Sequence, residues 1–165
     1  MKIPSTTLQN QRGVMLLEAL ISILIFSIGI LAIIGLQVSS IKLANDSKYR
    51  ADASLLANQL VGAMWAAQSS PTFTADFAGT AFNVTTGACA GGTQYCTWAS
   101  GVAATIPITG VSAPTVTIAQ ITLPITGASS VVTSTAMIDI WWTMPGDATN
   151  GGGGHHYQTF TQINN

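Results

Sequence analysis

The hydrophobic pattern opens with a long, uninterrupted apolar run. From Val14 to Leu36 the chain has 23 residues, and Glu18 is the only one that can carry a charge. A membrane-spanning helix needs about 20 predominantly apolar residues at a rise of roughly 1.5 Å each. Leu, Ile and Ala dominate the run and no proline interrupts it. The pattern therefore predicts a continuous helix that can cross a bilayer.

After this run, apolar and polar residues are interleaved with a helical period. Leu56, Leu60 and Met64 recur at intervals of four, as on one face of a helix. Pro71 ends the pattern, because the residue before a proline avoids the helical region. An ordinary amphipathic surface helix is the alternative for this second half. We predict one helix from about Val14 to Gln68, divided into a transmembrane half (14–36) and an amphipathic half (37–68).

Beyond Pro71 the composition shifts to Thr, Ala, Gly, Ser and Val with frequent turn residues, which is typical of short strands. The glycine-rich segment Gly151–Gly154 predicts a loop that joins the last two strands as a hairpin. The fold class is therefore α+β, with a helical spine packed against an antiparallel sheet in a head of residues 69–165. The predicted strands are Ala81–Thr85, Gln94–Trp98, Thr115–Leu123, Thr135–Thr143 and Tyr157–Ile163.

In two of the predicted strands, the apolar pattern also predicts which face each side chain occupies. The apolar residues of Thr115–Leu123 change parity between Ile118 and Ile121, which predicts a bulge or an irregular join. Thr135–Thr143 alternates cleanly, so alternate residues should point to opposite faces. We expect Ala136, Ile138, Ile140 and Trp142 to face the helix and Met137, Asp139 and Trp141 to face outward.

The charged residues beside the apolar run predict its orientation in the membrane. Charged residues are only 7% of the chain. Lys2 and Arg12 precede the apolar run and no acid accompanies them, which favours a cytoplasmic amino terminus and export of everything after Leu36. The later basic residues are few and mixed with acids. The sequence therefore contains no basic patch, and we do not predict nucleic-acid binding.

The start of the chain resembles a type IV prepilin. The features are a short basic, polar segment that ends at Gly13, an apolar residue at Val14, and Glu18 inside the membrane helix. The resemblance implies that residues 1–13 are a leader, that prepilin peptidase cuts between Gly13 and Val14, and that the new Val14 amine is methylated. It also implies that Glu18 meets the terminal amine of a neighbouring subunit. Such pilins usually have phenylalanine where this chain has Val14 and proline where it has Gly35.

Further segments narrow the resemblance to minor pilins of the PilV family. They are Ser27–Leu31 and Gly35–Gln37 in the helix, and Ile140–Trp142 and Tyr157–Ile163 near the end. This resemblance implies other major and minor pilins, the inner-membrane assembly platform and membrane lipid as partners. It places the chain in the inner membrane with a periplasmic head before assembly, and in the pilus afterwards.

Other classes remain open. A cleaved secretory signal has an apolar core of only 7–15 residues, which this run exceeds. A simple membrane anchor explains the run but leaves Gly13 and Glu18 unexplained. A pseudopilin of a type II secretion system shares both residues and drives secretion. A membrane-anchored periplasmic binding protein is the third possibility.

Cys89 and Cys96 lie in the part expected to be exported, where a disulfide persists. Six residues separate them, and Gly91-Gly92 supplies a turn, so we predict a structural disulfide. The alternatives are a redox dithiol, which usually has a two-residue spacer, and a metal pair, which would need further ligands.

No segment has a recognisable catalytic pattern, so we predict no enzymatic activity, no cofactor and no metal site. Adjacent His155 and His156 on a strand would point to opposite faces and make a poor chelate. We expect Trp65 and one of Trp141 and Trp142 to be core residues, because a small head must bury its large side chains. The only acids in the head are Asp76, Asp139 and Asp147.

Overall fold

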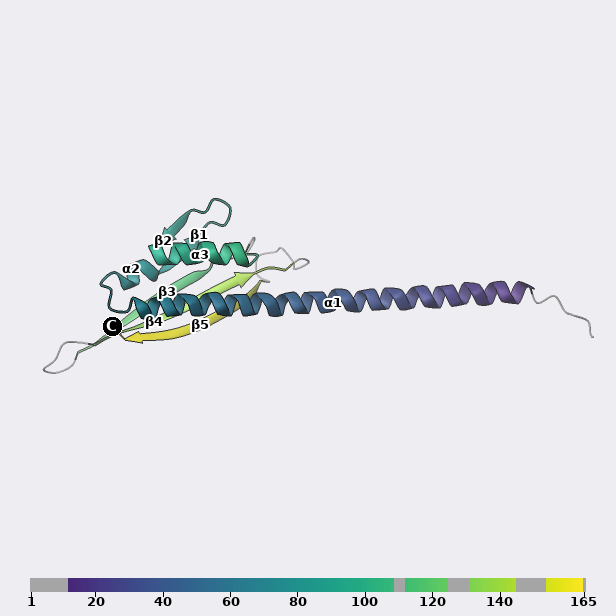
Figure 1. The fold of residues 1–165 in the computed structure, drawn as a ribbon, viewed down its shortest axis with the longest axis horizontal. Helices are drawn as coiled ribbons and strands as arrows, with labels where there is room; N and C mark the ends of the chain where they lie inside the picture. Colours follow the sequence, from purple (N-terminus) through teal and green to yellow (C-terminus); the bar gives the residue numbers. More distant parts are fainter. Residues whose placement is uncertain (1–11, 109–111, 125–130, 145–153, 165) are drawn as a thin grey trace, which may run out of the picture. The chain divides into compact units, whose positions relative to one another are not determined.

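The computed structural model describes residues 12–108, 112–124, 131–144 and 154–164 of the 165 (Figure 1). The chain divides into two compact units, one up to Leu43 and the other, which we call the head, from Ala44 onward. Helix α1, Arg12–Ala66, is continuous over 55 residues and contributes to both units. The predicted long helix is therefore confirmed, with both ends two residues earlier than expected.

The first unit is the apolar half of α1. Its large apolar side chains between Val14 and Leu43 are between 41% and 72% exposed. The helix is long and apolar enough to cross a membrane and is compatible with a membrane anchor or a signal sequence. Three hydroxyls in it, those of Ser22, Ser27 and Ser40, each donate to the carbonyl four residues earlier. These polar groups are thus satisfied inside the helix, as a bilayer requires.

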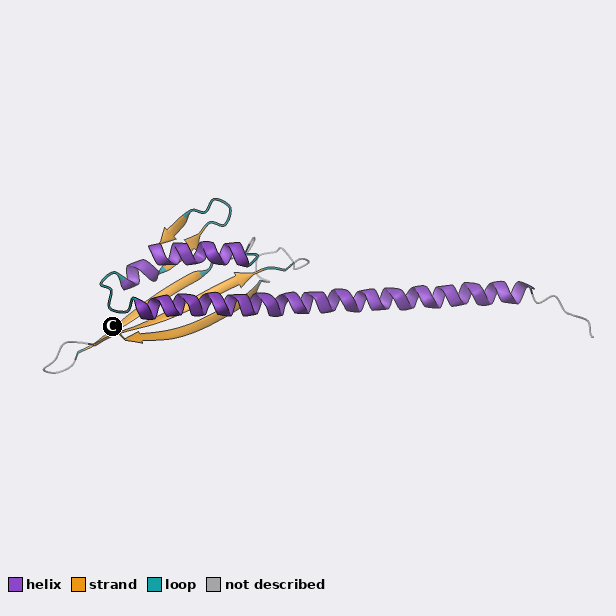
Figure 2. Cartoon of the chain, in the orientation of Figure 1, coloured by secondary structure: helices purple, strands orange, loops and turns teal. Residues whose placement is uncertain are grey.

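The head contains a five-stranded antiparallel sheet in the order β2-β1-β3-β4-β5 (Figure 2). Three predicted strands are confirmed with altered ends, and Thr115–Leu123 is confirmed as predicted. The pairing of β4 with β5 confirms that the last two strands are antiparallel, while most of the loop between them lies outside the described residues. The bounds are α2 Phe73–Phe77, β1 Gly79–Phe82, β2 Cys89–Gly91, α3 Thr93–Thr105, β3 Thr115–Leu123, β4 Val131–Trp142 and β5 His155–Asn164.

The prediction of a strand at Gln94–Trp98 is wrong, because this segment begins helix α3. The residues that α3 buries recur with a helical period rather than a period of two: Tyr95, Trp98, Ala99 and Val102. The period becomes visible only when the apolar positions after Trp98 are counted together with those before it. A five-residue window was too short to distinguish the two patterns.

The predicted bulge in β3 is also wrong. All nine residues of β3 pair with β4 in one continuous register. The apolar residues of β3 change from one face to the other because only the first part of the strand packs in the core. Val116 is 1% exposed on the inner face, whereas Gln120 on the same face donates to Ser134. Ile121 lies on the other face and is 55% exposed.

The head core lies between the sheet and the helices. The predicted inward set of β4 is confirmed, since all four of its side chains are fully buried. Small residues on α1, Ala53 and Ala57, are also fully buried and let the helix backbone approach closely. The indole nitrogen of Trp98 donates to the carbonyl of Leu56 at 3.0 Å and joins α3 to α1. The core residues of α1 are Ala53, Ala57, Leu60 and Met64.

Two predictions about large or charged side chains need correction. Trp65 is 45% exposed and not a core residue, because it follows Met64 and lies about 100° around the helix from the buried stripe. Asp139 points outward as predicted yet is only 7% exposed, since Gln158 on β5 covers it and donates to its carboxylate at 2.8 Å. Trp142 is the buried member of the tryptophan pair.

Tyr95 on α3 packs against strands β1 and β2 in the head. Its ring is fully buried, and its hydroxyl donates to the carbonyl of Pro114 at 2.8 Å. The ring lies so close to Gly79 and Gly91 that a Cβ at either position would overlap it. Burial raises the pKa of Tyr95 to about 12.

We expect Tyr95 to make the head sensitive to high pH. The folded pKa of about 12 exceeds the usual tyrosine pKa of 10.0, which applies to the unfolded chain. The stability that the neutral phenol provides is therefore complete below pH 10 and is lost as the pH rises to 12, by roughly 2 kcal/mol. Tyr95→Phe should lose about 1 kcal/mol at neutral pH, because the Pro114 carbonyl loses its donor, and should lack this pH dependence. Denaturant unfolding of both proteins in detergent checks this, and equal slopes above pH 10 would contradict it.

Candidate functional site

The residues singled out near the amino terminus lie on one helix. Gly13 and Val14 are in the first turn of α1, and Glu18 follows Val14 by four residues. Residues at this spacing share a helix face and are about 6 Å apart along the axis. The predicted cleavage position and the predicted assembly carboxylate are therefore one turn apart on the same side of α1.

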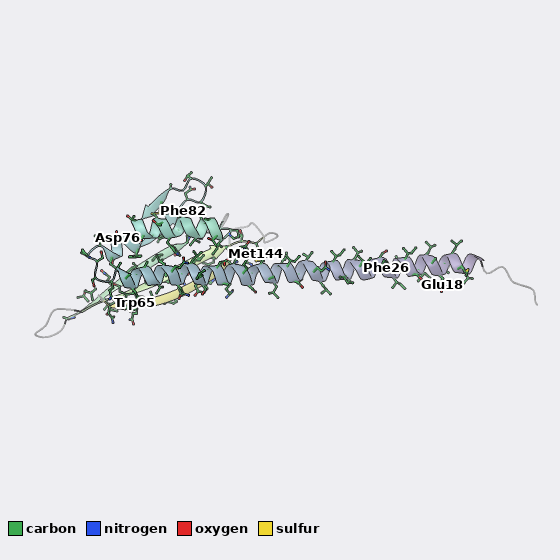
Figure 3. All side chains as sticks on the ribbon, viewed as in Figure 1. Glu18, Phe26, Trp65, Asp76, Phe82 and Met144 are labelled. Atoms are coloured by element: carbon green, nitrogen blue, oxygen red, sulfur yellow. A yellow bond between two sulfur atoms is a disulfide. The ribbon has the colours of Figure 1, made fainter. Side chains whose placement is uncertain are left out.

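The surroundings of Glu18 are apolar. Its side chain projects from the helix, as Phe26 does two turns later (Figure 3). Val14, Leu17, Ile21 and Ser22 line a shallow groove beside it. Within the part of the chain that the structure describes, no side chain pairs with the Glu18 carboxylate.

This arrangement has a defined electrostatic consequence. An ionisable group within an apolar membrane segment costs roughly 2.5–3.5 kcal/mol on insertion scales. The chain itself supplies no counter-charge for Glu18 among the described residues. A cation from another molecule, approaching along the exposed groove, would reduce that cost. Such a contact is the one that the apolar surroundings of Glu18 would favour.

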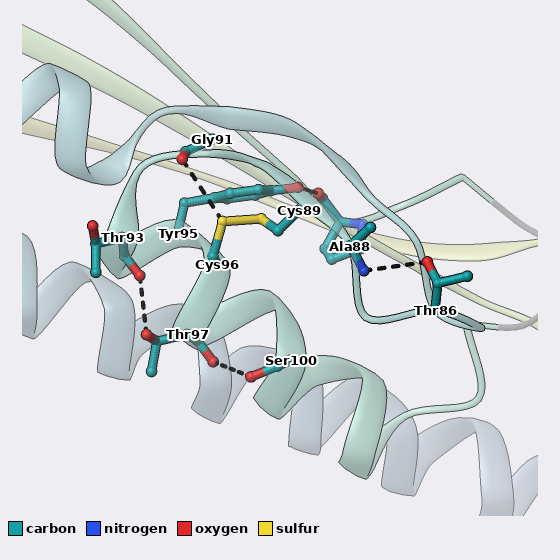
Figure 4. The surroundings of a disulfide bond; sticks show 10 residues. Thr86, Ala88, Cys89, Gly91, Thr93, Tyr95, Cys96, Thr97 and Ser100 are labelled. Carbon is teal, nitrogen blue, oxygen red and sulfur yellow. Dashed lines mark hydrogen bonds between the residues drawn. A yellow bond between two sulfur atoms is a disulfide. The ribbon is translucent and has the colours of Figure 1, made fainter.

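The second predicted pair is confirmed as a disulfide. Cys89, the first residue of β2, is bonded to Cys96 in the first turn of α3, with 5.8 Å between the Cα atoms (Figure 4). The Cys96 sulfur also lies 3.7 Å from the carbonyl oxygen of Gly91. The bond thus closes the tight turn between β2 and α3.

The glycines of that turn are required by packing. Gly92 precedes α3, and its N–H donates to the carbonyl of Ala78 at 3.0 Å. A Cβ on Gly92 would collide with the backbone of Ala75 and Asp76. The turn therefore packs closely against the head, with the Tyr95 ring at Gly91 and the backbone of Ala75 and Asp76 at Gly92.

The two histidines lie on opposite faces of β5, as the sequence predicted. His155 stacks on Trp142 and His156 on Trp141, with ring centroids 5.8 and 4.5 Å apart. In addition, the Nδ1 atom of His155 lies 2.9 Å from a carboxylate oxygen of Asp46 on α1. This contact, which joins β5 to α1, was missed because no sequence pattern relates residues so far apart.

Two of the acids predicted in the head make hydrogen bonds within it. Asp76 accepts a hydrogen bond of 2.6 Å from Thr72 at the start of α2, and Asp139 pairs with Gln158. Among the described residues, no group of three His, Cys, Asp or Glu side chains could hold a metal ion. Asp147 lies outside the described residues.

Comparison with protein-family models, with curated proteins and with solved structures gives no match for this chain.

The disulfide gives a testable expectation. Closing an eight-residue loop stabilises a fold by about 2.5 kcal/mol in the chain-entropy model. The double variant Cys89→Ser, Cys96→Ser should lose about that much stability and loosen the turn, while the sheet from β3 to β5 persists. Denaturant unfolding gives the loss. Thiol titration of the unreduced wild type in denaturant should find no free thiol, and two free thiols would contradict the expectation.

Proposed function

We propose that this chain is a minor pilin of the PilV kind, processed by prepilin peptidase and used in the assembly or modification of type IV pili. The observation that carries the proposal is the position of Glu18. It lies one turn from Val14 in an exposed apolar helix that continues into a folded head. A plain membrane anchor has no use for an unpaired carboxylate at this depth.

The proposed maturation begins with the leader on the cytoplasmic side, where Lys2 and Arg12 would hold it. Prepilin peptidase hydrolyses the amide bond between Gly13 and Val14 and then methylates the Val14 amine. Removal of the leader changes the net charge of the chain from −1 to −3 with His neutral. Cleavage also creates an ammonium group at the start of the apolar helix.

That ammonium is the cation that Glu18 lacks. In the assembled pilus, the Val14 ammonium of an adjacent subunit lies beside Glu18 in an environment of low dielectric constant. Glu18 is about 6 Å along the helix axis from its own Val14, so pairing favours neighbours displaced by roughly one helical turn. The ion pair would therefore select the axial register in which a subunit docks.

The head fits an exported location. Its disulfide is of the kind that persists in the oxidising periplasm. Residues 69–165 contain no lysine, arginine or glutamate, which leaves this part of its surface nearly uncharged, whereas Asp46, Lys48, Arg50 and Asp52 lie on α1. A nearly uncharged surface suits contact with other subunits better than long residence as a free monomer. A pseudopilin of a type II secretion system would use the same Val14 and Glu18 contact. Deletion of the gene distinguishes that function from the one proposed, as described below.

The decisive variant is Glu18→Ala in the strain that makes the protein. Loss of the ion pair should lower incorporation into sheared pili by about tenfold if the pair contributes roughly 1.4 kcal/mol. Cleavage, membrane level and head folding should be unchanged. Glu18→Asp should recover part of the incorporation, because its carboxylate is shorter by one methylene. Immunoblots of pili and membranes measure both amounts.

Ser22→Ala is the matched control, since it lies one turn further along the same groove and its hydroxyl is satisfied within the helix. It should assemble like the wild type. Equal incorporation of Glu18→Ala and wild type would overturn the pairing. If deletion of the gene abolishes protein secretion and leaves pili intact, the pseudopilin function replaces the one proposed.

A further inference from the structure

The loop that joins β1 to β2 projects from the head and carries a short polar motif (Figure 1). It begins with Asn83, Val84 and Thr85, and residues 83–88 are all exposed. Asparagine, then any residue except proline, then threonine or serine is the acceptor motif for glycans on the asparagine amide of exported proteins. The chain contains this motif twice, at residues 83–85 and at residues 45–47, and the two copies differ in structure.

The side chain of Asn83 holds the conformation of the loop. Its Oδ1 atom accepts hydrogen bonds of 2.9 Å from the N–H groups of both Thr85 and Thr86. Its main-chain N–H donates to the carbonyl of Ala88, and its carbonyl accepts from the N–H of Gly87, which has a φ of 70°. The loop is therefore an Asx turn that keeps the first and third residues of the motif together on the surface.

Two polar groups of the motif take no part in this turn. Within the described residues, neither the Nδ2 atom of Asn83 nor the hydroxyl of Thr85 makes a hydrogen bond. The turn needs only a side-chain oxygen at position 83, which aspartate would supply equally well, and it does not need threonine at position 85. The turn thus accounts for Oδ1 alone, whereas the glycan acceptor motif accounts for the exposed amide nitrogen and hydroxyl.

The copy at residues 45–47 is unsuited to the same reaction. Asn45 lies within α1 and is partly buried. Successive residues of a helix are about 100° apart, so the side chains of Asn45 and Ser47 leave the axis in directions about 200° apart. A transferase cannot contact the amide of one and the hydroxyl of the other at the same time. The helical copy is therefore an internal control for the exposed one.

We propose that Asn83 is a modification site, at which a membrane-bound transferase attaches an oligosaccharide after export of the head. This inference rests on the export that the proposed function includes. The Nδ2 atom attacks the anomeric carbon of a sugar carried on a lipid diphosphate. A carbon–nitrogen bond forms, the bond from the anomeric carbon to the diphosphate oxygen breaks, and the amide loses one proton to a base of the transferase. The lipid diphosphate leaves, and the glycan stays on the loop.

Mass spectrometry of the full chain isolated from its own strain tests the proposal. After reduction of the disulfide, chymotrypsin releases a peptide that ends at Tyr95 and contains Asn83. This peptide should carry the added mass of a glycan, and fragmentation by electron transfer should place that mass on Asn83. The peptide that contains Asn45 should carry none. An unmodified Asn83, or an added mass on the hydroxyl of Thr85 or Thr86 instead, overturns the proposal.

Matched variants identify the groups that react. Asn83→Asp keeps the oxygen that holds the turn but lacks Nδ2, so it should lose the glycan completely and fold like the wild type, as judged by near-ultraviolet circular dichroism. Thr85→Ala should also lose the glycan, whereas Thr85→Ser, which keeps the hydroxyl, should retain it. A glycan present on Thr85→Ala to the same extent as on the wild type contradicts the assigned acceptor motif.

Failure of the proposed function gives a different result. If the wild-type chain is absent from sheared pili and Asn83 carries a glycan, the minor-pilin function is wrong and the modification site stands. If the chain is present in sheared pili with Asn83 unmodified, the modification site is wrong and the minor-pilin function stands.

Discussion

The proposed function depends on one carboxylate in an apolar helix. Glu18 is the only ionisable residue between Val14 and Leu36, and the described part of the chain gives it no partner. In the isolated chain, no contact offsets the free energy that the Glu18 carboxylate costs in an apolar environment. In the proposed function this cost is offset when the Val14 ammonium of a second subunit lies at the same depth, so the helix would associate with others along its length. The rest of the chain would then be an exported head that takes part in the same association.

A single helix serves two environments because its composition changes along its length. Before Leu43 its side chains are apolar and exposed, as lipid or neighbouring helices would require. After Ala44 it buries a narrow stripe that includes Ala53 and Ala57 against the head core. Alanine at these positions brings the backbone close to the sheet, while Trp98 on α3 bonds to the same helix. The second half of α1 is therefore a structural element of the head.

The sequence predicts what depends on long or strictly periodic patterns. The long helix, strand β3, the buried alternation of β4 and the disulfide all follow from local composition or spacing. Helix α3 was missed because its buried residues become periodic only over a longer window than the aromatic cluster around Trp98. The contact between Asp46 and His155 was missed because it depends on how β5 lies beside α1. Such contacts are set by the fold as a whole, and no local pattern contains them.

In the proposed function Val14, and not Met1, is the first residue of the mature protein. Intact-mass and peptide mass spectrometry of the chain isolated from membranes or pili tests this directly. We expect an amino-terminal peptide that begins at Val14 and carries one methyl group, with residues 1–13 absent. A chain that retains Met1, or that begins after the apolar run ending at Leu36, would contradict it, because in neither case would an ammonium lie at the depth of Glu18.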